Sequence, residues 1–125
     1  MAAQEQPPGI LLGYIDYRPV DDATTRQITE FSLILAALFL LDILTTHLIL
    51  WLGGIELNPA MAGIVASPLV HLAIKAGTML LIILVSLVAE TRVRGSGITF
   101  YCILITFYLF VIVNNTFVLI PHIMG

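Results

Sequence analysis

Residues 31–53 read FSLILAALFLLDILTTHLILWLG, and this run of 23 residues decides the fold. All but five of its side chains are apolar. The polar ones are Ser32, Asp42, Thr45, Thr46 and His47. A helix of about 20 apolar residues crosses the ~30 Å hydrocarbon core of a bilayer. The run therefore predicts a membrane-spanning helix that carries a carboxylate, Asp42, near its middle.

Two further apolar runs follow, at residues 69–89 and 98–120. The chain of 125 residues is 59% hydrophobic and 10% charged, whereas soluble domains are about 45–50% apolar and about 25% charged. Its mean hydropathy is +1.05. We therefore expect an all-α integral membrane helical bundle, with three transmembrane helices at 31–53, 69–89 and 98–120 in a transmembrane domain of residues 31–125.

This composition excludes three classes of protein. A secreted disulfide scaffold needs paired cysteines, and Cys102 is single. A nucleic-acid binder needs a basic patch, which the five basic residues do not form. A soluble enzyme would need far more polar surface than 10% of charged residues can give, which is less than half of the usual share of about 25%. The expected partner is the lipid bilayer, and no nucleic acid is expected.

The basic residues predict the orientation, because Lys and Arg accumulate in cytoplasmic loops. Arg18 and Arg26 precede the first span, and Arg92 and Arg94 lie between the second and the third. The segments on the other side, residues 54–67 and those after 120, contain no Lys or Arg. We expect a multi-pass protein of the plasma membrane with a cytoplasmic N-terminus and an outside C-terminus.

Residues 1–30 form the expected cytoplasmic N-terminal tail. The apolar and aromatic residues 10–20 predict an interfacial segment, with docking of a partner as the alternative. Residues 10–15 are too short for the core of a signal peptide, so the first span is expected to be an uncleaved anchor. Asp21 or Asp22 can cap a helix, and Thr24 and Gln27 have capping-box spacing. The first helix is therefore expected to begin about two turns before the bilayer.

The connection between the first two spans allows two structures. Gly53 and Gly54 end a helix, Asn58-Pro59 is a turn signal, and a run of small residues leads to Pro68. Either the second span begins at Pro59 and is kinked at Pro68, or residues 59–67 form a re-entrant half-helix. Of the two, we favour the kinked helix.

Each predicted span carries polar side chains in one layer of the bundle. Asp42 lies near mid-membrane, and Lys75 lies about 9 Å below the outer start of the second span, with His71 one turn above it. A charge at the membrane centre costs about 2.5–3.5 kcal/mol, so each one needs a partner. We predict an Asp42–Lys75 ion pair, with Glu56 as a second possible partner of Lys75.

These residues define a candidate ion-binding or ligand-binding site. Its members are Asp42, Thr45, Thr46, His47, Glu56, Asn58, His71, Lys75, Asn114 and Asn115. The alternative is that the same polar cluster only holds the helices together. Interhelical hydrogen bonds are the expected role of Asn114 or Asn115.

Three further features receive simpler interpretations. The histidines at 47, 71 and 122 lack the spacing of a helical zinc site, so no metal and no cofactor is expected. Cys102 is expected to be buried packing. Five aromatic residues of the third span are expected to face lipid or the interface. They are Phe100, Tyr101, Phe107, Tyr108 and Phe110.

Two motifs and a lysine carry a family resemblance. They are Asp42-Ile-Leu-Thr45-Thr46, Gly54-Ile-Glu56-Leu-Asn58-Pro59-Ala-Met61 and Lys75. In these the chain resembles a small prokaryotic membrane family, the domain of unknown function 5658. The resemblance covers roughly residues 31–89 and leaves the tail and the third span outside. It implies no activity, but it implies that Asp42, Thr46, Glu56, Asn58, Pro59 and Lys75 act as one unit.

Three functions compete. An oligomeric transporter or ion-binding protein would use the Asp42–Lys75 pair, and conduction would need a homo-oligomer because three helices enclose little space. A structural or accessory subunit of a larger complex would use its small residues for helix packing. These are Ala36, Ala37, Gly63, Ala73, Ala76 and Gly77. An intramembrane enzyme is least supported, since no Ser-His, Cys-His or His-Glu-x-x-His arrangement is present.

Overall fold

The computed structural model describes residues 19–125. Within this range the chain forms four helices and no strand. They are α1 (Asp22–Trp51), α2 (Pro59–Val65), α3 (Pro68–Arg92) and α4 (Ser96–Met124). The expectations for residues 1–18, including the interfacial segment and Arg18, lie outside the described residues.

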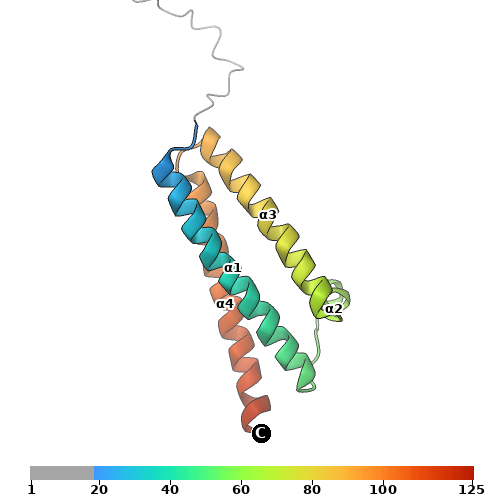
Figure 1. Ribbon diagram of the computed structural model, residues 1–125. Helices are drawn as coiled ribbons and strands as arrows, with labels where there is room; N and C mark the ends of the chain where they lie inside the picture. Colours follow the sequence, from blue (N-terminus) through green and yellow to red (C-terminus); the bar gives the residue numbers. More distant parts are fainter. Residues whose placement is uncertain (1–18) are drawn as a thin grey trace, which may run out of the picture.

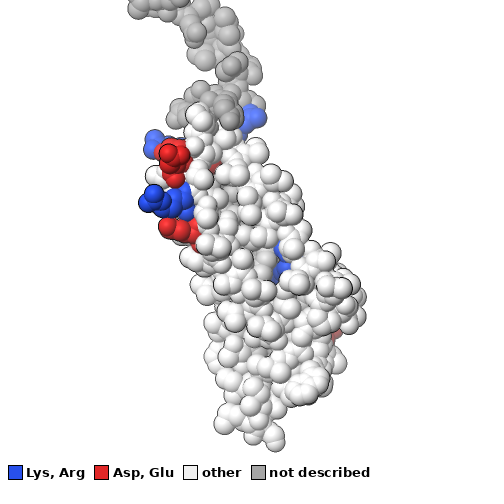
Figure 2. Space-filling view, in the orientation of Figure 1, with Lys and Arg blue, Asp and Glu red and all other residues white. Residues whose placement is uncertain are grey.

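Three of the helices, α1, α3 and α4, are long and apolar enough to cross a membrane. They confirm the three predicted spans and make the chain a multi-pass membrane protein in a lipid environment. Figure 1 shows α1 and α4 running in the same direction, with α3 antiparallel to both. Charged side chains gather at one end of the molecule, and the rest of the visible surface is almost free of them (Figure 2). We call the two ends the charged end (Asp21, Arg26, Arg92, Arg94) and the loop end (residues 52–67).

Helix α1 begins nine residues before the predicted span, because Asp21 caps it. The Oδ1 atom of Asp21 accepts a hydrogen bond of 2.7 Å from the backbone N–H of Thr24. The hydrogen bonds with Thr24 hold the pKa of Asp21 below its ordinary value. Asp21 is thus the cap that the sequence left open between Asp21 and Asp22. Thr24 lies within the first turn of the helix and does not form a capping box with Gln27.

The connection at the loop end contains a separate short helix. Gly53 has a φ of +96°, which ends α1, and the side chain of Asn58 caps α2 by accepting from the backbone N–H of Ala60 at 3.1 Å. Ser67 is extended, with φ −128° and ψ 126°, so α2 and α3 are not one helix. The favoured kinked helix is therefore wrong. Pro68 disfavours helical backbone at Ser67 and is itself suited to the first position of a new helix.

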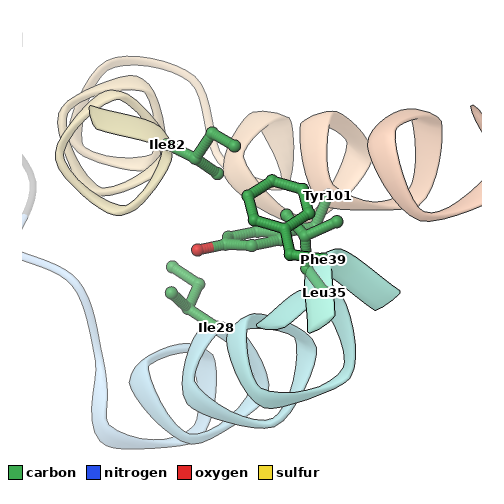
Figure 3. Close-up of a cluster of buried hydrophobic side chains, with 5 residues drawn as sticks. All are labelled: Ile28, Leu35, Phe39, Ile82 and Tyr101. Atoms are coloured by element: carbon green, nitrogen blue, oxygen red, sulfur yellow. The ribbon is translucent and has the colours of Figure 1, made fainter. Parts of the chain in front are cut away.

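An apolar core joins the three long helices towards the charged end. Its buried members are Ile28, Leu35, Phe39, Ile82 and Tyr101 (Figure 3). The hydroxyl groups of Tyr101 and Ser32 share a hydrogen bond of 2.5 Å. Because Tyr101 is fully buried, its expected lipid-facing position is wrong. Cys102 is exposed, so its expected buried position is wrong too. Adjacent helical residues point about 100° apart, and only one of the two can face α1.

The turn between α3 and α4 is held by a buried carboxylate. Glu90 accepts hydrogen bonds from the backbone N–H groups of Gly95 at 2.7 Å and Gly97 at 2.9 Å. Gly95 has a φ of +86°, which favours glycine. At Gly97 a Cβ atom would lie 2.6 Å from the backbone oxygen of Ser86, so glycine lets α4 approach α3 closely. The turn fixes the direction in which α4 returns along α1.

Candidate functional site

The predicted ion pair between Asp42 on α1 and Lys75 on α3 is confirmed. The Nζ atom of Lys75 lies 2.8 Å from Oδ2 of Asp42. Lys75 is 8% exposed and Asp42 is 6% exposed, so water has little access to either charge. A buried charge is tolerated when it is paired and hydrogen-bonded. The pair therefore links α1 to α3 in the interior of the bundle.

Aromatic side chains complete the surroundings of Lys75. Its ammonium group donates a hydrogen bond of 3.0 Å to the hydroxyl oxygen of Tyr108 on α4. It also lies 4.8 Å from the centre of the Phe39 ring and 4.4 Å from that of Tyr108. Aromatic faces attract cations. Tyr108 thus belongs to the site, and its expected lipid-facing role is wrong. Phe110 is exposed as expected, whereas exposed Phe107 also lines the cavity described below.

The other carboxylate oxygen of Asp42, Oδ1, accepts hydrogen bonds from side chains on α1 and α4. Asn115 donates to Oδ1 of Asp42 at 3.3 Å and to the hydroxyl oxygen of Thr45 at 3.0 Å. The hydroxyl group of Thr46 donates to the same Oδ1 at 3.4 Å. Asn114 is exposed and forms no bond to Asp42 in the described structure. Of the two adjacent asparagines, Asn115 is therefore the one that joins α4 to the cluster.

Two histidines extend the cluster towards the loop end. The Nδ1 atom of His71 on α3 shares a hydrogen bond of 3.2 Å with Nε2 of His47 on α1. Nε2 of His71 lies 3.9 Å from Oδ2 of Asp42. Buried His71 leaves this Nε2 atom without a hydrogen-bond partner, while His47 is partly exposed. His122 bonds instead to the backbone oxygen of Val118, outside the cluster.

Glu56 and Asn58 lie in the connection between α1 and α2, at the loop end of the bundle. Glu56 accepts a hydrogen bond of 2.9 Å from the backbone N–H of Asn58. It forms no ion pair with Lys75 in residues 19–125, so this expected second partner is wrong. Over the same residues no three His, Cys, Asp or Glu side chains are arranged to hold a metal ion. The Glu56 carboxylate therefore lies beside the polar cluster without pairing with Lys75.

A cavity of about 400 Å³ brings most of the predicted residues together. It is lined by Asp42, Thr46, Glu56, Asn58, Met61, Lys75, Phe107, Tyr108, Val111 and Asn115. Asn114 lines a neighbouring cavity of about 180 Å³ together with Glu56 and Asn115. The larger cavity therefore contains two carboxylates and one ammonium group.

One signal in the sequence could have identified Tyr108. Tyr101, Tyr108 and Asn115 are spaced by seven residues, which places them on one face of α4. All three meet α1 or α3 through contacts described above. Phe39 lies three residues before Asp42 and so shares its face, again by helical spacing. Reading the aromatic residues as one lipid-facing class concealed this pattern.

A comparison with models of protein families matches most of the chain. The family model described as domain of unknown function (DUF5658) matches residues 33–121. No curated protein and no solved structure matches the chain. The match continues past residue 89, where the resemblance in the sequence ended, and includes the α4 residues Tyr108 and Asn115. Because it covers more than two thirds of the 125 residues, the chain belongs to the DUF5658 family.

Proposed function

We propose that this is a non-enzymatic membrane protein that binds a small cationic solute in the 400 Å³ cavity and carries it across the membrane as a homo-oligomer. The observation that carries the proposal is the charge of the cavity lining. Asp42 is paired with Lys75, whereas Glu56 faces the same space with only a backbone N–H as its partner. The cavity therefore has one negative charge that no lysine or arginine in its lining balances.

The size and the walls of the cavity also support a small organic cation. Binding sites for small molecules are about 300–1,000 Å³ and combine apolar walls with a few polar groups. Here Phe107, Tyr108 and Met61 supply the apolar walls, and aromatic rings attract ammonium groups. Lys75 itself shows how an ammonium group is received, between a carboxylate and two rings.

Thermal unfolding of the purified protein in detergent tests the binding. We expect methylammonium or choline to raise the melting temperature, since a ligand at 100 times its Kd adds about 2.7 kcal/mol. Glu56→Gln should abolish the shift, because it removes the unbalanced charge while keeping the oxygen that accepts from Asn58. Glu30→Gln is the matched control, since Glu30 is an exposed carboxylate on α1 outside the cavity. An equal shift with acetate, or a full shift in Glu56→Gln, would contradict the proposal.

Transport requires more than one copy, because three helices enclose little space. Ala73 and Gly77 support close approach of a second copy, since both are exposed and lie one turn apart on α3. Flux of labelled methylammonium into liposomes should depend on the protein and be lost in Asp42→Asn. Binding without flux would restrict the function to a receptor or sensor of the solute.

A second candidate function is assembly of a larger membrane complex. The observation that favours it is that Asp42 alone connects three helices, through Lys75 on α3 and Asn115 on α4. Polar contacts of this kind hold helices together in lipid. Stoichiometric unlike subunits in a gently extracted preparation would favour assembly over transport.

For the orientation, we propose that the charged end lies in the cytoplasm of a cell whose plasma membrane holds the protein. The contact of 3.9 Å between Arg94 and Asp21 supports placing the start of α1 and the α3–α4 turn on one side. Basic residues favour the cytoplasmic side. In a Cys102→Ser background, Gly125→Cys should react with an impermeant maleimide added to intact cells, and Asp22→Cys should not. The reverse labelling would invert the orientation.

A further inference from the structure

We propose that His47 and His71 form a proton relay that connects the loop end of the bundle to Asp42, and that the proton is the ion exchanged against the solute. The exchange part rests on the function proposed above, whereas the relay part does not. Three features carry the inference: the hydrogen bond between the two imidazoles, the unpartnered nitrogen of His71, and the position of that nitrogen beside Asp42.

The inner end of the relay is the unpartnered nitrogen of His71. His71 is 1% exposed, and its Nε2 atom has no hydrogen-bond partner. A buried polar atom without a partner costs about 1–3 kcal/mol, so a purely structural histidine would be expected to satisfy it. Its neighbour is Oδ2 of Asp42 at 3.9 Å, and a movement of under about 1 Å would bring these atoms within hydrogen-bond distance. The atom is thus placed to exchange a proton with Asp42.

The outer end of the relay is His47, which connects His71 to the surface of the bundle. His47 contacts His71 through its Nε2 atom at 3.2 Å and is partly exposed. It lies four residues, or about 6 Å, before the end of α1. That end carries Trp51, which is 82% exposed, and tryptophan is typical of the membrane interface. The two imidazoles therefore connect interface depth with a carboxylate near mid-membrane.

The proton transfers balance over this pair. With a proton on Nε2 of each imidazole, His71 passes its Nε2 proton to Oδ2 of Asp42. His47 passes its Nε2 proton to Nδ1 of His71, and a proton from the surrounding water binds Nδ1 of His47. One proton has then moved inward, and both histidines are neutral in the opposite tautomer. Imidazole can do this because it donates at one nitrogen while it accepts at the other.

Protonation of Asp42 would change the cavity. The groups that face Asp42 and His71 are Lys75 on α3, Glu56 in the connection and Tyr108 on α4, while α2 contributes no titratable side chain. With neutral Asp42, Lys75 keeps Tyr108 but loses its counter-charge. The charges of the cavity lining then sum to zero instead of minus one. A bound cation would be released when a proton arrives, which is exchange of one for the other.

Time-resolved infrared spectroscopy of the full chain in lipid nanodiscs tests the relay. A light-triggered acid jump is applied, and the C=O band of a protonated carboxylic acid is followed. The part of the band that is absent in Asp42→Asn belongs to Asp42. In His71→Gln and in His47→Gln we expect this part to rise about 10²-fold more slowly, as when a positioned acid-base group is removed. The final amplitude at low pH should be retained, because the relay affects the rate.

Three controls make the result decisive. His122→Gln should leave the rate unchanged, since His122 lies at the same end outside the cluster. Added imidazole should restore the rate in His71→Ala, which a merely structural role would not explain. His71→Gln preserves polarity and approximate size, so it decides the matter if His71→Ala does not fold. A wild-type rate in His71→Gln, or the absence of any Asp42 band at low pH, would overturn the relay.

Methylammonium binding separates the relay from the proposed function. Glu56→Gln should lose cation binding and still protonate Asp42 rapidly. If the wild type does not bind the cation but has an intact relay, only the cation proposal is overturned. Cation affinity that does not fall as the Asp42 band rises would defeat the exchange alone.

Discussion

At the scale of single residues, Lys75 is important for stability because it balances the buried charge of Asp42. Lys75→Met would leave the Asp42 charge buried without its counter-charge. Removing one member of a buried pair destabilises a protein by about 3–5 kcal/mol. We expect that loss in unfolding by SDS titration, and most of it should be recovered when Asp42→Asn is added. A double variant as unstable as Lys75→Met alone would refute a direct energetic coupling.

The adjacent asparagines provide a second comparison at this scale. Asn115→Ala removes hydrogen bonds to Asp42 and Thr45 and should cost about 1 kcal/mol, a typical value for such bonds in membranes. Asn114→Ala should change stability by less than about 0.5 kcal/mol, because Asn114 is exposed and contributes nothing to the cluster. The same SDS titration measures both variants. Equal losses of stability in the two variants would show that the hydrogen bonds of Asn115 do not stabilise the protein.

At the scale of elements, the start of α1 should depend on pH. The folded-state pKa of Asp21 is lowered by hydrogen bonds with Thr24. The charged cap therefore stabilises α1 above the unfolded-state pKa, and this contribution is lost as the pH falls through the lowered folded-state pKa. Hydrogen exchange of the first-turn amides should accelerate over that acidic range. Asp21→Asn should remove the pH dependence, since asparagine caps without titrating.

The close packing of α4 on α3 gives a further prediction at this scale. Gly97→Ala would place a Cβ atom 2.6 Å from the backbone oxygen of Ser86, so the helices must separate. We expect a loss of about 1–3 kcal/mol, as in other overpacked interiors. Gly63→Ala is the matched control, because no atom lies within 4 Å of the Cβ position at Gly63 on α2. Thermal unfolding of the two variants should diverge, with Gly63→Ala at least as stable as the wild type.

The elements also show how far the sequence leads. The three spans were predictable because an apolar run of about 20 residues matches the hydrocarbon core of a bilayer. The break between α2 and α3 was missed, although Pro68 signals it by disfavouring helical backbone at Ser67. Glu90 gave no signal either, because its partners are backbone N–H groups whose position depends on the turn. Asp42 and Lys75 were found because each charge in lipid requires a partner.

At the scale of the whole molecule, the exposed small residues Ala73 and Gly77 on α3 predict self-association. Gly77→Leu should reduce the native mass of the gently extracted protein from an oligomer to a monomer, because a large side chain prevents close helix approach. Asp42→Asn should retain the oligomer, since Asp42 is buried within one copy. Native mass spectrometry distinguishes the two. A monomeric wild type would exclude the oligomer, and dissociation of Asp42→Asn would favour assembly as the role of the cluster.

The position expected for Asp42 from the sequence, near the middle of the membrane, also has an electrical consequence. A charge that moves from either surface to the middle of the bilayer crosses about half of the transmembrane voltage. The full crossing is worth about 2.3 kcal/mol per 100 mV, so half is about 1.1 kcal/mol. This energy changes the ratio of protonated to ionised Asp42 by about sevenfold per 100 mV at 298 K. Asp42 would thus respond to the energisation of the membrane as well as to acidity.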